Sequence, residues 1–311
     1  MSLIDRILTE PEFQSAPPVL VDVGAAGGVS HTWERIARYS IAVAFEPDAR
    51  ESAPLTGAQR KFKRWIYVPA VVTDSPSDSD TAVFYLTRSP QCSSTLRPCT
   101  DALQRWAFAD LFDVIGQREI PATTLQSVLQ SHGLPGLDWL KCDTQGTDFR
   151  LFMGLPAEIR RRVLAVEFEP GLIDAYESED TFSQILGCMR SEPYLLAECV
   201  LQKTPLACAK WKHSQWYRRL APTHPGWGNL RYLRTTGSPT ETLDRRSMLL
   251  LWVLATLQGH FAHAHNVAEE GVDRFEGGIF LKMQKASLRQ LRLAMAVRVP
   301  VWILQRLLLR G

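Results

Sequence analysis

Short, largely apolar segments alternate with helical patterns through the first two thirds of the chain, and this alternation limits the fold more than any other feature. Strands and helices in this order fit a parallel sheet with helical crossovers. We therefore predict a doubly wound, mostly parallel α/β sheet, in which ligands bind beyond the carboxyl ends of the strands. The strongest predicted strands are Val19–Gly28, Ile41–Asp48, Trp65–Asp74, Leu137–Gly146 and Val163–Pro170.

The character of the sequence changes near residue 238. Ser238, Pro239 and Glu241 have the spacing of a helix capping box with proline at the first helical position. A long apolar helix follows, then a second helical pattern after Gly271, with Gly278–Met283 as the one further strand signal. We predict a sheet domain over residues 1–237 and a helical C-terminal region over residues 238–311.

The composition is that of an ordinary globular protein, with 45% hydrophobic and 22% charged residues among 311. The chain starts with an acidic, amphipathic pattern rather than a secretory leader. Its longest apolar run, Met248–Leu257, is shorter than the roughly 20 residues that a bilayer requires. Six scattered cysteines without a C-x-x-C pair indicate reduced thiols. We expect a cytoplasmic protein.

The net charge of +2 conceals two basic segments. Residues 199–240 hold seven lysines and arginines and no acid, and residues 277–311 hold seven more and again no acid. Since these two segments together carry +14, the rest of the chain carries −12. Two basic surfaces are therefore expected on an otherwise acidic protein.

The first predicted strand ends in a glycine-rich turn, which is a basic device for binding nucleotide-containing cofactors. The turn contains Gly24, Gly27 and Gly28 after the acid Asp22, and Glu46 ends the next strand, where a carboxylate can bind ribose hydroxyls. Ala26 breaks the G-x-G-x-x-G pattern of dinucleotide sites, which favours S-adenosylmethionine. The alternative is a turn whose glycines serve packing alone. The predicted cofactor-binding residues are Asp22, Gly24, Ala26, Gly28, Glu46, Pro47 and Val71.

Five blocks carry a resemblance to a known family. VDVGAAGG, AFEPD, TTLQSVL, LKCDTQGTDFRLFMGL and VEFE occur in the order seen in FkbM-type methyltransferases, over Val19–Val200. The fourth block is similar to the family pattern K-x-D-x-x-G-x-[DE], with Lys141, Asp143, Gly146 and Asp148 at its fixed positions. One departure is Ala26, where many members carry asparagine. The resemblance implies a Rossmann-like S-adenosylmethionine-dependent methyltransferase, commonly one that O-methylates a sugar hydroxyl of a glycan, glycolipid or secondary metabolite.

Methyl transfer to a hydroxyl needs positioning and a base. Catalytic candidates should therefore lie at the carboxyl ends of the fourth and fifth of these predicted strands, Leu137–Gly146 and Val163–Pro170. Asp143 is the predicted base, with Lys141 on the same strand face. Glu167 is a further catalytic candidate, and Glu169 and Asp148 are predicted substrate contacts. Structural roles remain open for two of them, an ion pair for Lys141 and helix capping for Asp148. A divalent ion on Asp143, Glu167 and Glu169 is an alternative that we do not favour.

The remaining predicted acceptor contacts come from two loops. Ser93, Ser94 and Thr95 form a hydroxyl-rich loop, from which Ser94 is predicted to bind substrate, with a plain turn as the alternative. Residues 203–234 interleave seven cations with five aromatic residues, a composition that suits an acceptor lid over an anionic glycan or lipid-linked sugar. Trp211 and Trp216 are the predicted substrate contacts there. Tryptophans packed into the core are the alternative.

The C-terminal residues 288–311 alternate arginines with apolar residues, as in helices that lie on an anionic membrane surface. Peripheral contact with the inner face of the membrane is therefore one expectation, with a core-packing or homodimer-forming helix as the alternative, and Pro300 is expected to kink or break this helix. His260, His263 and His265 have helical spacing, but no nearby acid or cysteine completes a metal site, so none is predicted.

Two other functions remain open. The basic aromatic segment also fits an RNA methyltransferase, although the FkbM-like blocks do not point to nucleic acid. Ala26 is the one feature that supports a non-catalytic binding subunit with a methyltransferase fold. The acceptor itself, metal dependence and the oligomeric state are left undecided by the sequence.

Overall fold

The computed structural model describes residues 1–26, 28, 30–51, 60–75, 79–211, 214–237 and 242–308, with side chains as far as residue 299. The chain forms two compact units. One is Pro17–Arg234, and the other combines Met1–Ala16 with Thr235–Gly311. Gly27 and the predicted capping box at Ser238, Pro239 and Glu241 lie outside the described residues.

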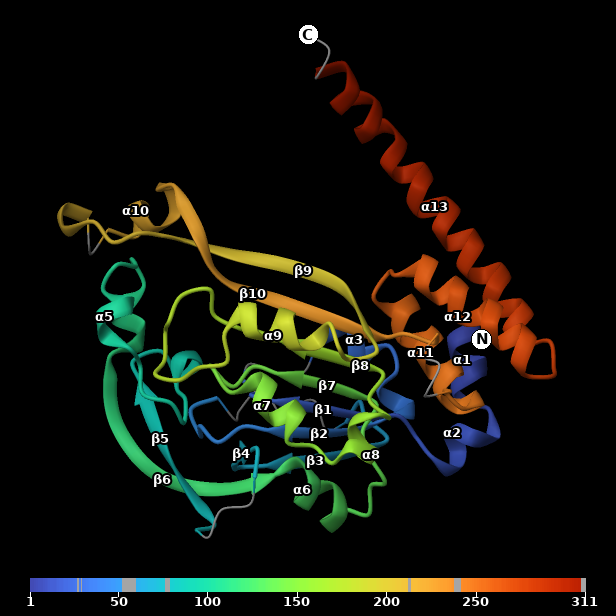
Figure 1. The fold of residues 1–311 in the computed structure, drawn as a ribbon, viewed down its shortest axis with the longest axis horizontal. Coiled ribbons are helices and arrows are strands. Elements are labelled where there is room, and N and C mark those ends of the chain that lie inside the picture. The colour runs from blue at the N-terminus through green and yellow to red at the C-terminus, as the bar shows by residue number, and fades with distance from the viewer. Residues whose placement is uncertain are drawn as a thin grey trace. The chain divides into compact units, whose positions relative to one another are not determined.

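The larger unit contains a seven-stranded sheet (Figure 1) with the order β3-β2-β1-β7-β8-β10-β9. The first five strands of this order are parallel, and β10 is antiparallel to both β8 and β9. The predicted mostly parallel α/β fold is therefore confirmed. The strands are β1 (Val19–Val23), β2 (Ile41–Phe45), β3 (Arg64–Val68), β7 (Trp139–Cys142), β8 (Ala165–Phe168), β9 (Tyr194–Pro205) and β10 (Thr223–Arg234).

The middle strands are buried on both faces, which explains why they lack polar alternation. Every residue of β1 and β2 is buried, and Val21, Val43, Leu140, Val166 and Phe152 belong to one core cluster. Helices packed in this unit are α3 (His31–Glu34), α6 (Leu125–Ser131), α7 (Asp148–Met153), α8 (Ala157–Arg160) and α9 (Phe182–Met189), with the 3-10 turn η1 (Ala37–Tyr39).

A second sheet has the order β4-β6-β5, and its long strand β6 curves visibly in Figure 1. The strands are β4 (Val71–Thr73), β5 (Thr81–Thr87) and β6 (Val114–Thr124). The single strand predicted over Trp65–Asp74 is thus wrong, because it is divided between the two sheets. Pro69 lies at the division and has no backbone N–H to continue the ladder. The turns between β5 and β6 include η2 (Pro90–Cys92), α5 (Thr100–Leu103) and η3 (Ala109–Phe112).

Strands β9 and β10 form a long antiparallel hairpin, with η4 (Ala209–Trp211) and α10 (Gln215–Leu220) at its tip (Figure 1). The sequence pattern did not predict β10. The first residues of β10 include Pro225 and Gly226, which have the composition of a loop, and the register between the strands shifts at this point. The basic aromatic segment therefore lies partly in the end of β9 and in β10, and partly in the tip between these strands.

The smaller unit is helical, with α1 (Leu3–Leu8), α2 (Pro11–Ser15), α11 (Arg245–Leu257), α12 (Phe261–Arg274) and α13 (Ile279–Leu308). The predicted apolar helix is α11, in which Met248–Thr256 are all buried. It begins after Asp244, whose side chain accepts from the Ser247 N–H. At its start, Arg245 pairs with Glu12 of α2.

Two predictions for the C-terminal helices are wrong. Gly278–Met283 is not a strand, since α13 begins at Ile279. Helix α13 packs closely on α12 because Gly271 has no side chain, and a Cβ atom there would overlap the Phe280 ring. Pro300 does not break α13, which continues to Leu308. No helix among the described residues is long and apolar enough to cross a membrane.

Candidate active site

A cavity of about 590 Å³ lies at the carboxyl ends of β1, β2, β7 and β8. One part of it is lined by the predicted cofactor residues Gly24, Ala26, Glu46, Pro47 and Val71. The other part is lined by residues from the loops of the second sheet, from the segment between β8 and α9, and from the β9–β10 hairpin, among them Phe108, Phe112, Tyr176, Lys203 and Trp227. Parallel strands with neighbouring carboxyl ends bring these segments together.

Gly24 allows the β1 turn to approach the β7 turn. Its φ is +85°, in the left-handed region that favours glycine, and a Cβ atom there would lie 2.0 Å from the Asp143 carbonyl oxygen. The backbone on both sides is held by hydrogen bonds, from Gly24 N–H to the Phe45 carbonyl and from Asp143 N–H to the Val23 carbonyl, at 3.0 and 2.9 Å. Gly24 therefore allows the turn after β1 to lie directly against the backbone of Asp143. Gly28 is also left-handed, with φ +110°, but does not line the cavity.

Glu46 is buried at the end of β2. Burial raises the pKa of its carboxyl to about 7, which the hydrogen bond from the Asp48 N–H partly opposes. The Tyr67 hydroxyl donates to the Glu46 carbonyl at 3.0 Å and holds the backbone in place. A carboxyl with this pKa titrates in the physiological range and changes its hydrogen-bonding capacity there.

Asp22 lies beneath the cofactor turn and does not line the cavity. It is fully buried, and burial raises its pKa to about 6 against the opposing effect of Lys141. Lys141 Nζ donates to Asp22 Oδ1 at 2.9 Å, whereas no residue that the structure describes donates to the buried Asp22 Oδ2. A buried acceptor without a partner is costly, so Asp22 Oδ2 is available to a donor from a ligand or water.

Charged side chains form a ladder across five adjacent strands. Asp22, Lys141, Glu167, Arg231 and Glu198 are register partners on β1, β7, β8, β10 and β9, with alternating sign. Arg231 contacts Glu167 at 3.1 Å and Glu198 at 2.6 Å, and the Trp139 indole donates to Glu167 at 2.8 Å. Opposite charges on facing strands stabilise a sheet.

This ladder changes the interpretation of Lys141 and Glu167. Neither lines the cavity, although both were predicted to be catalytic. Burial would lower the pKa of Lys141, but the carboxylates of Asp22, Asp143 and Glu167 outweigh it and raise that pKa. Lys141 is ion-paired with Asp22, and both Glu167 oxygens are engaged within the sheet. The catalytic roles of these two residues stay predictions.

Asp143 follows β7 and lines the cavity. Gln145 holds it in place, because the Gln145 amide donates to Asp143 Oδ1 at 2.7 Å. The Tyr176 hydroxyl lies 3.0 Å from Gln145 Oε1 and 2.8 Å from the Cys92 carbonyl. Gln145 itself has a φ of +59°, an uncommon conformation for a residue with a side chain. The β7–α7 loop is therefore built to fix the direction of the Asp143 carboxylate.

Glu169 lines the same cavity beside Asp143. Its pKa is raised to about 8, first by burial and then by the charges of Asp143 and Asp148 and a hydrogen bond to the Asp143 side chain. The Trp227 indole donates to Glu169 Oε1 at 2.8 Å, which opposes that shift. The Glu169 carboxyl is therefore mostly protonated at pH 7.

Two predicted substrate contacts form hydrogen bonds within the protein. Asp148 is buried and accepts from the Thr144 N–H, the Thr144 hydroxyl and the Glu169 N–H, at 2.8, 2.6 and 2.7 Å, so it joins the β7 loop to the end of β8. Ser94 donates to the Gln145 carbonyl at 2.8 Å. Neither residue lines the cavity, whereas Ser93 and Thr95 beside Ser94 do.

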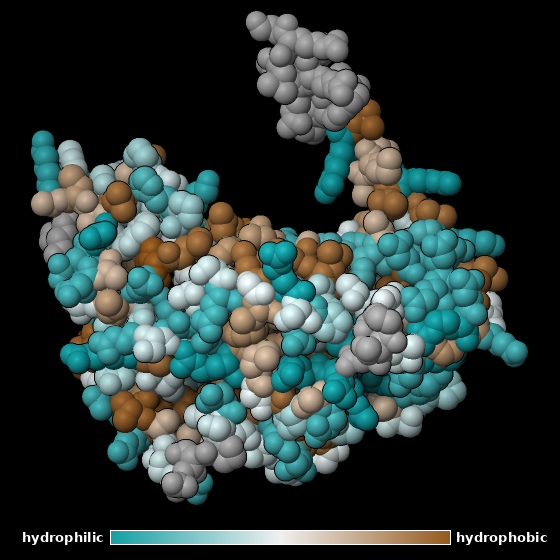
Figure 2. All heavy atoms as spheres, in the orientation of Figure 1, coloured by the Kyte–Doolittle hydropathy of each residue, from teal (hydrophilic) through white to brown (hydrophobic). Residues whose placement is uncertain are grey.

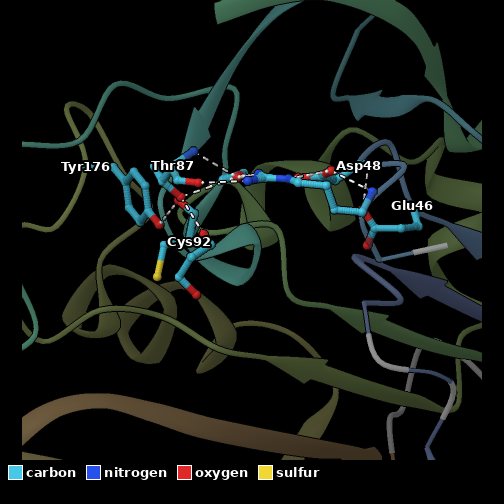
Figure 3. Close-up of polar contacts among 8 residues, drawn as sticks. Glu46, Asp48, Thr87, Cys92 and Tyr176 are labelled. Carbon is cyan, nitrogen blue, oxygen red and sulfur yellow. Dashed lines mark hydrogen bonds and ion pairs between the residues drawn. The ribbon is translucent and has the colours of Figure 1, made fainter. Parts of the chain in front are cut away.

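A polar network joins the cofactor strand to the loops above it (Figure 3). Arg50 binds the Asp48 carboxylate and also donates to the Thr87 carbonyl and the Ser93 hydroxyl, both at 3.1 Å. Figure 3 shows Glu46 and Asp48 on one side of the network and Thr87, Cys92 and Tyr176 on the other. The loop that contains Thr87 and Ser93 is thus attached to Asp48 and Arg50, which follow Glu46 in the chain.

The aromatic residues that line the cavity differ from those predicted. Trp211 and Trp216 lie at the hairpin tip, 47% and 72% exposed, and do not line it. Trp227 lines it instead, in edge contact with Phe108 at 6.2 Å between ring centroids. Phe112 packs on Tyr176 at 5.5 Å. Of these four aromatic lining residues, only Trp227 belongs to the basic aromatic segment, residues 203–234.

The Methyltransferase FkbM domain matches residues 22–196 of this chain. The chain belongs to the FkbM methyltransferase family. As a member of this family, the protein is an S-adenosylmethionine-dependent methyltransferase. The match spans the glycine turn, Glu46, Asp143 and Glu169, but not the tip of the β9–β10 hairpin or the smaller helical unit.

Solved structures resemble this FkbM chain only weakly. An uncharacterized protein from Listeria monocytogenes serotype 4b is 7% identical, with 96% of this chain and 98% of that chain covered and a TM-score of 0.32. TrmK from M. capricolum, solved with S-adenosyl-homocysteine, is 6% identical, with coverage of 94% and 96% and a TM-score of 0.31. No curated protein matches the chain.

The lining of the cavity fits S-adenosylmethionine. Four carboxyl residues line it, Glu46, Asp143, Glu169 and Glu179, against one described cation, Lys203. A cationic sulfonium suits such a lining, whereas the phosphates of a dinucleotide do not. Asp22 Oδ2, which has no donor among the described residues, is a further acceptor beneath the turn. Among the described residues, no group of three or more histidines, cysteines and acids has the arrangement of a metal site.

Cofactor affinity is expected to rise with pH because Glu46 must ionise to accept hydrogen bonds from both ribose hydroxyls. Because the pKa of Glu46 is about 7, the carboxyl ionises between pH 6 and pH 8. Below that pH, each unit should weaken binding by up to about tenfold. Calorimetric titration of S-adenosylmethionine at pH 6 and pH 8 measures the effect. Glu46→Gln should bind weakly at both values, and a wild-type affinity that does not change over this range would contradict the assignment.

Proposed function

We propose that this FkbM protein is an O-methyltransferase that methylates a sugar hydroxyl of a glycan, glycolipid or secondary metabolite. The observation that supports it most is the position of Asp143 beside Glu169, in the same cavity as Gly24 and Glu46. A base and a methyl donor facing one cavity are what methylation of a neutral hydroxyl requires.

The predicted cofactor residues Gly24, Ala26, Glu46, Pro47 and Val71 would hold S-adenosylmethionine, with Asp22 beneath the turn. When bound, this cofactor supplies a methyl group on a sulfonium, which is already activated for in-line displacement. The protein then has to orient the acceptor and remove its proton. In our proposal the Asp143 carboxylate accepts the hydroxyl proton as the new O–CH₃ bond forms. Gln145 keeps Asp143 Oδ1 engaged at 2.7 Å and so aims the second oxygen.

The aromatic part of the cavity favours a ring-shaped acceptor. Phe108, Phe112, Tyr176 and Trp227 line it together, and aromatic faces pack well against the C–H groups of a sugar ring. Trp227 also donates to Glu169, so one residue both contacts the acceptor and holds the carboxyl pair in place. Lys203 lines the cavity as its one described cation and suits an anionic substituent on the acceptor.

Trp227→Leu is expected to raise the acceptor KM by roughly 3–10-fold, because it removes an aromatic face worth about 0.5–1.5 kcal/mol. The matched control is Trp216→Leu, which changes a tryptophan of the same hairpin outside the cavity. Steady-state kinetics at saturating cofactor provide the comparison. Equal effects of the two substitutions would show that Trp227 does not contact the acceptor.

The proposed reaction is tested with methyl-labelled S-adenosylmethionine and a panel of hydroxyl acceptors that begins with deoxysugar-containing glycans. The expected product carries an O–CH₃ group, identified by NMR, and its formation requires Asp143. Methylation of nitrogen or carbon in the same panel, with no O-methyl product, would overturn the proposal.

RNA methylation is the second candidate, because the hairpin tip has a composition used for binding single strands. Trp211 and Trp216 are exposed there, and Lys210 lies 5.4 Å from the Trp211 ring centroid. An RNA gel shift at low salt that weakens steeply as salt is added would favour this function. Absence of a shift at low salt would exclude it.

A further inference from the structure

The first part of α13 packs within the helical unit through one face. Phe280, Met283 and Ser287 are buried at spacings of three and four residues, and the Trp252 indole donates to the Ser287 hydroxyl at 2.8 Å. Beyond Leu291, every described side chain except Ala294 is exposed. The packed face therefore ends while the helix continues to Leu308.

The exposed part of α13 is apolar. Leu293, Met295 and Val297 are 58%, 60% and 77% exposed. Leu281 and Met295 are both exposed and lie on one face, since their separation of 14 residues is close to four helical turns. Figure 2 shows brown apolar residues and teal hydrophilic residues together along the described part of this helix. Apolar side chains exposed over several turns of a helix indicate a surface that binds something.

A row of cations lies beside these apolar residues. Lys282, Lys285, Arg289 and Arg292 are spaced by three, four and three residues, which places them on one side of the helix, and all four are exposed. None of them forms an ion pair within the part of the chain that the structure describes. Residues 277–311 contain seven cations and no acid.

We propose that the exposed surface of α13, defined by Lys282, Lys285, Arg289, Arg292, Leu293, Met295, Val297 and Val299, binds an anionic lipid bilayer. Its charge selects this partner. A second copy of the helix would bring cations against cations with no acid to pair them. Phosphate headgroups provide the opposite charge, and the apolar side chains can enter the boundary between headgroups and acyl chains. Since no described residue of α13 lines the cavity, this inference does not depend on the identity of the acceptor.

The full chain should sediment with phosphatidylcholine vesicles that contain about 30% phosphatidylglycerol, and much less with phosphatidylcholine alone. A triple variant, Lys285→Gln, Arg289→Gln and Arg292→Gln, should weaken binding to the anionic vesicles by roughly 100-fold, since each cation near the surface contributes about fivefold. Met295→Ser with Val299→Ser should also weaken it. Added salt should release the wild type.

The matched control changes three exposed cations outside α13, Arg105→Gln, Arg118→Gln and Arg190→Gln, and so alters the net charge equally. It should leave vesicle binding close to that of the wild type. Equal loss in both triple variants would overturn the proposal, because net charge alone would then explain binding. The proposal is also overturned if the α13 variants convert a dimer to a monomer in analytical ultracentrifugation but bind vesicles unchanged.

Discussion

Asp143→Asn is expected to lower kcat by about 10²–10⁴-fold while the affinity for S-adenosylmethionine stays within about threefold. The asparagine keeps the size of the side chain and its contact with Gln145, but it cannot accept the proton of a hydroxyl. The loss should therefore appear in the chemical step and not in cofactor binding. Single-turnover methyl transfer with saturating acceptor measures it.

Two carboxyl residues of the same strand region serve as controls. Glu167 is two residues before Glu169, but it pairs with Arg231 and Trp139 outside the cavity, so Glu167→Gln should leave kcat within about threefold of the wild type. Glu169→Gln should also have a small effect near neutral pH, because Glu169 is protonated there and glutamine is a neutral substitute. An Asp143→Asn enzyme that keeps most of its rate would exclude Asp143 as the base.

Gly24→Ala is expected to destabilise the larger unit by roughly 2–5 kcal/mol and to abolish cofactor binding. About 1–3 kcal/mol comes from the left-handed backbone, and the remainder from overlap with a backbone atom that cannot move aside. The Cβ would lie 2.0 Å from the Asp143 carbonyl oxygen, so the clash also displaces the proposed base. Thermal unfolding and calorimetric titration of S-adenosylmethionine test both parts.

The matched control is Gly133→Ala, which has a similar φ of +67° but nothing within 4 Å of the added Cβ. It should cost about 1 kcal/mol, from backbone strain alone. Gly187→Ala, inside α9 and in open space, should stabilise slightly because alanine favours a helix. If Gly24→Ala and Gly133→Ala destabilised equally, the contact with Asp143 would not matter.

The cofactor part of the cavity could be predicted from sequence because one rule governs it. The carboxyl ends of β1, β2 and β7 lie side by side at one edge of the sheet, so Gly24, Glu46 and Asp143 had to meet. The strand pattern alone was sufficient to identify those ends.

The acceptor part could not be predicted in the same way. Phe108, Phe112 and Tyr176 come from turns and irregular segments without periodicity, and Trp227 comes from β10, which the loop-like composition of its first residues concealed. Glu167 and Glu169 were both predicted at the site, but only Glu169 lines the cavity. β8 ends at Phe168, so Glu167 faces Arg231 within the ladder while Glu169 lies beyond it.

The most direct test of this account is calorimetric titration of S-adenosylmethionine at pH 8 into wild type, Asp143→Asn and Glu46→Ala. The account predicts a micromolar Kd for wild type and Asp143→Asn, and a loss of roughly 100-fold in Glu46→Ala, because the ribose hydroxyls lose a buried acceptor. No heat from well-folded wild type, or equal affinity in Glu46→Ala, would contradict the assignment of this cavity to the cofactor.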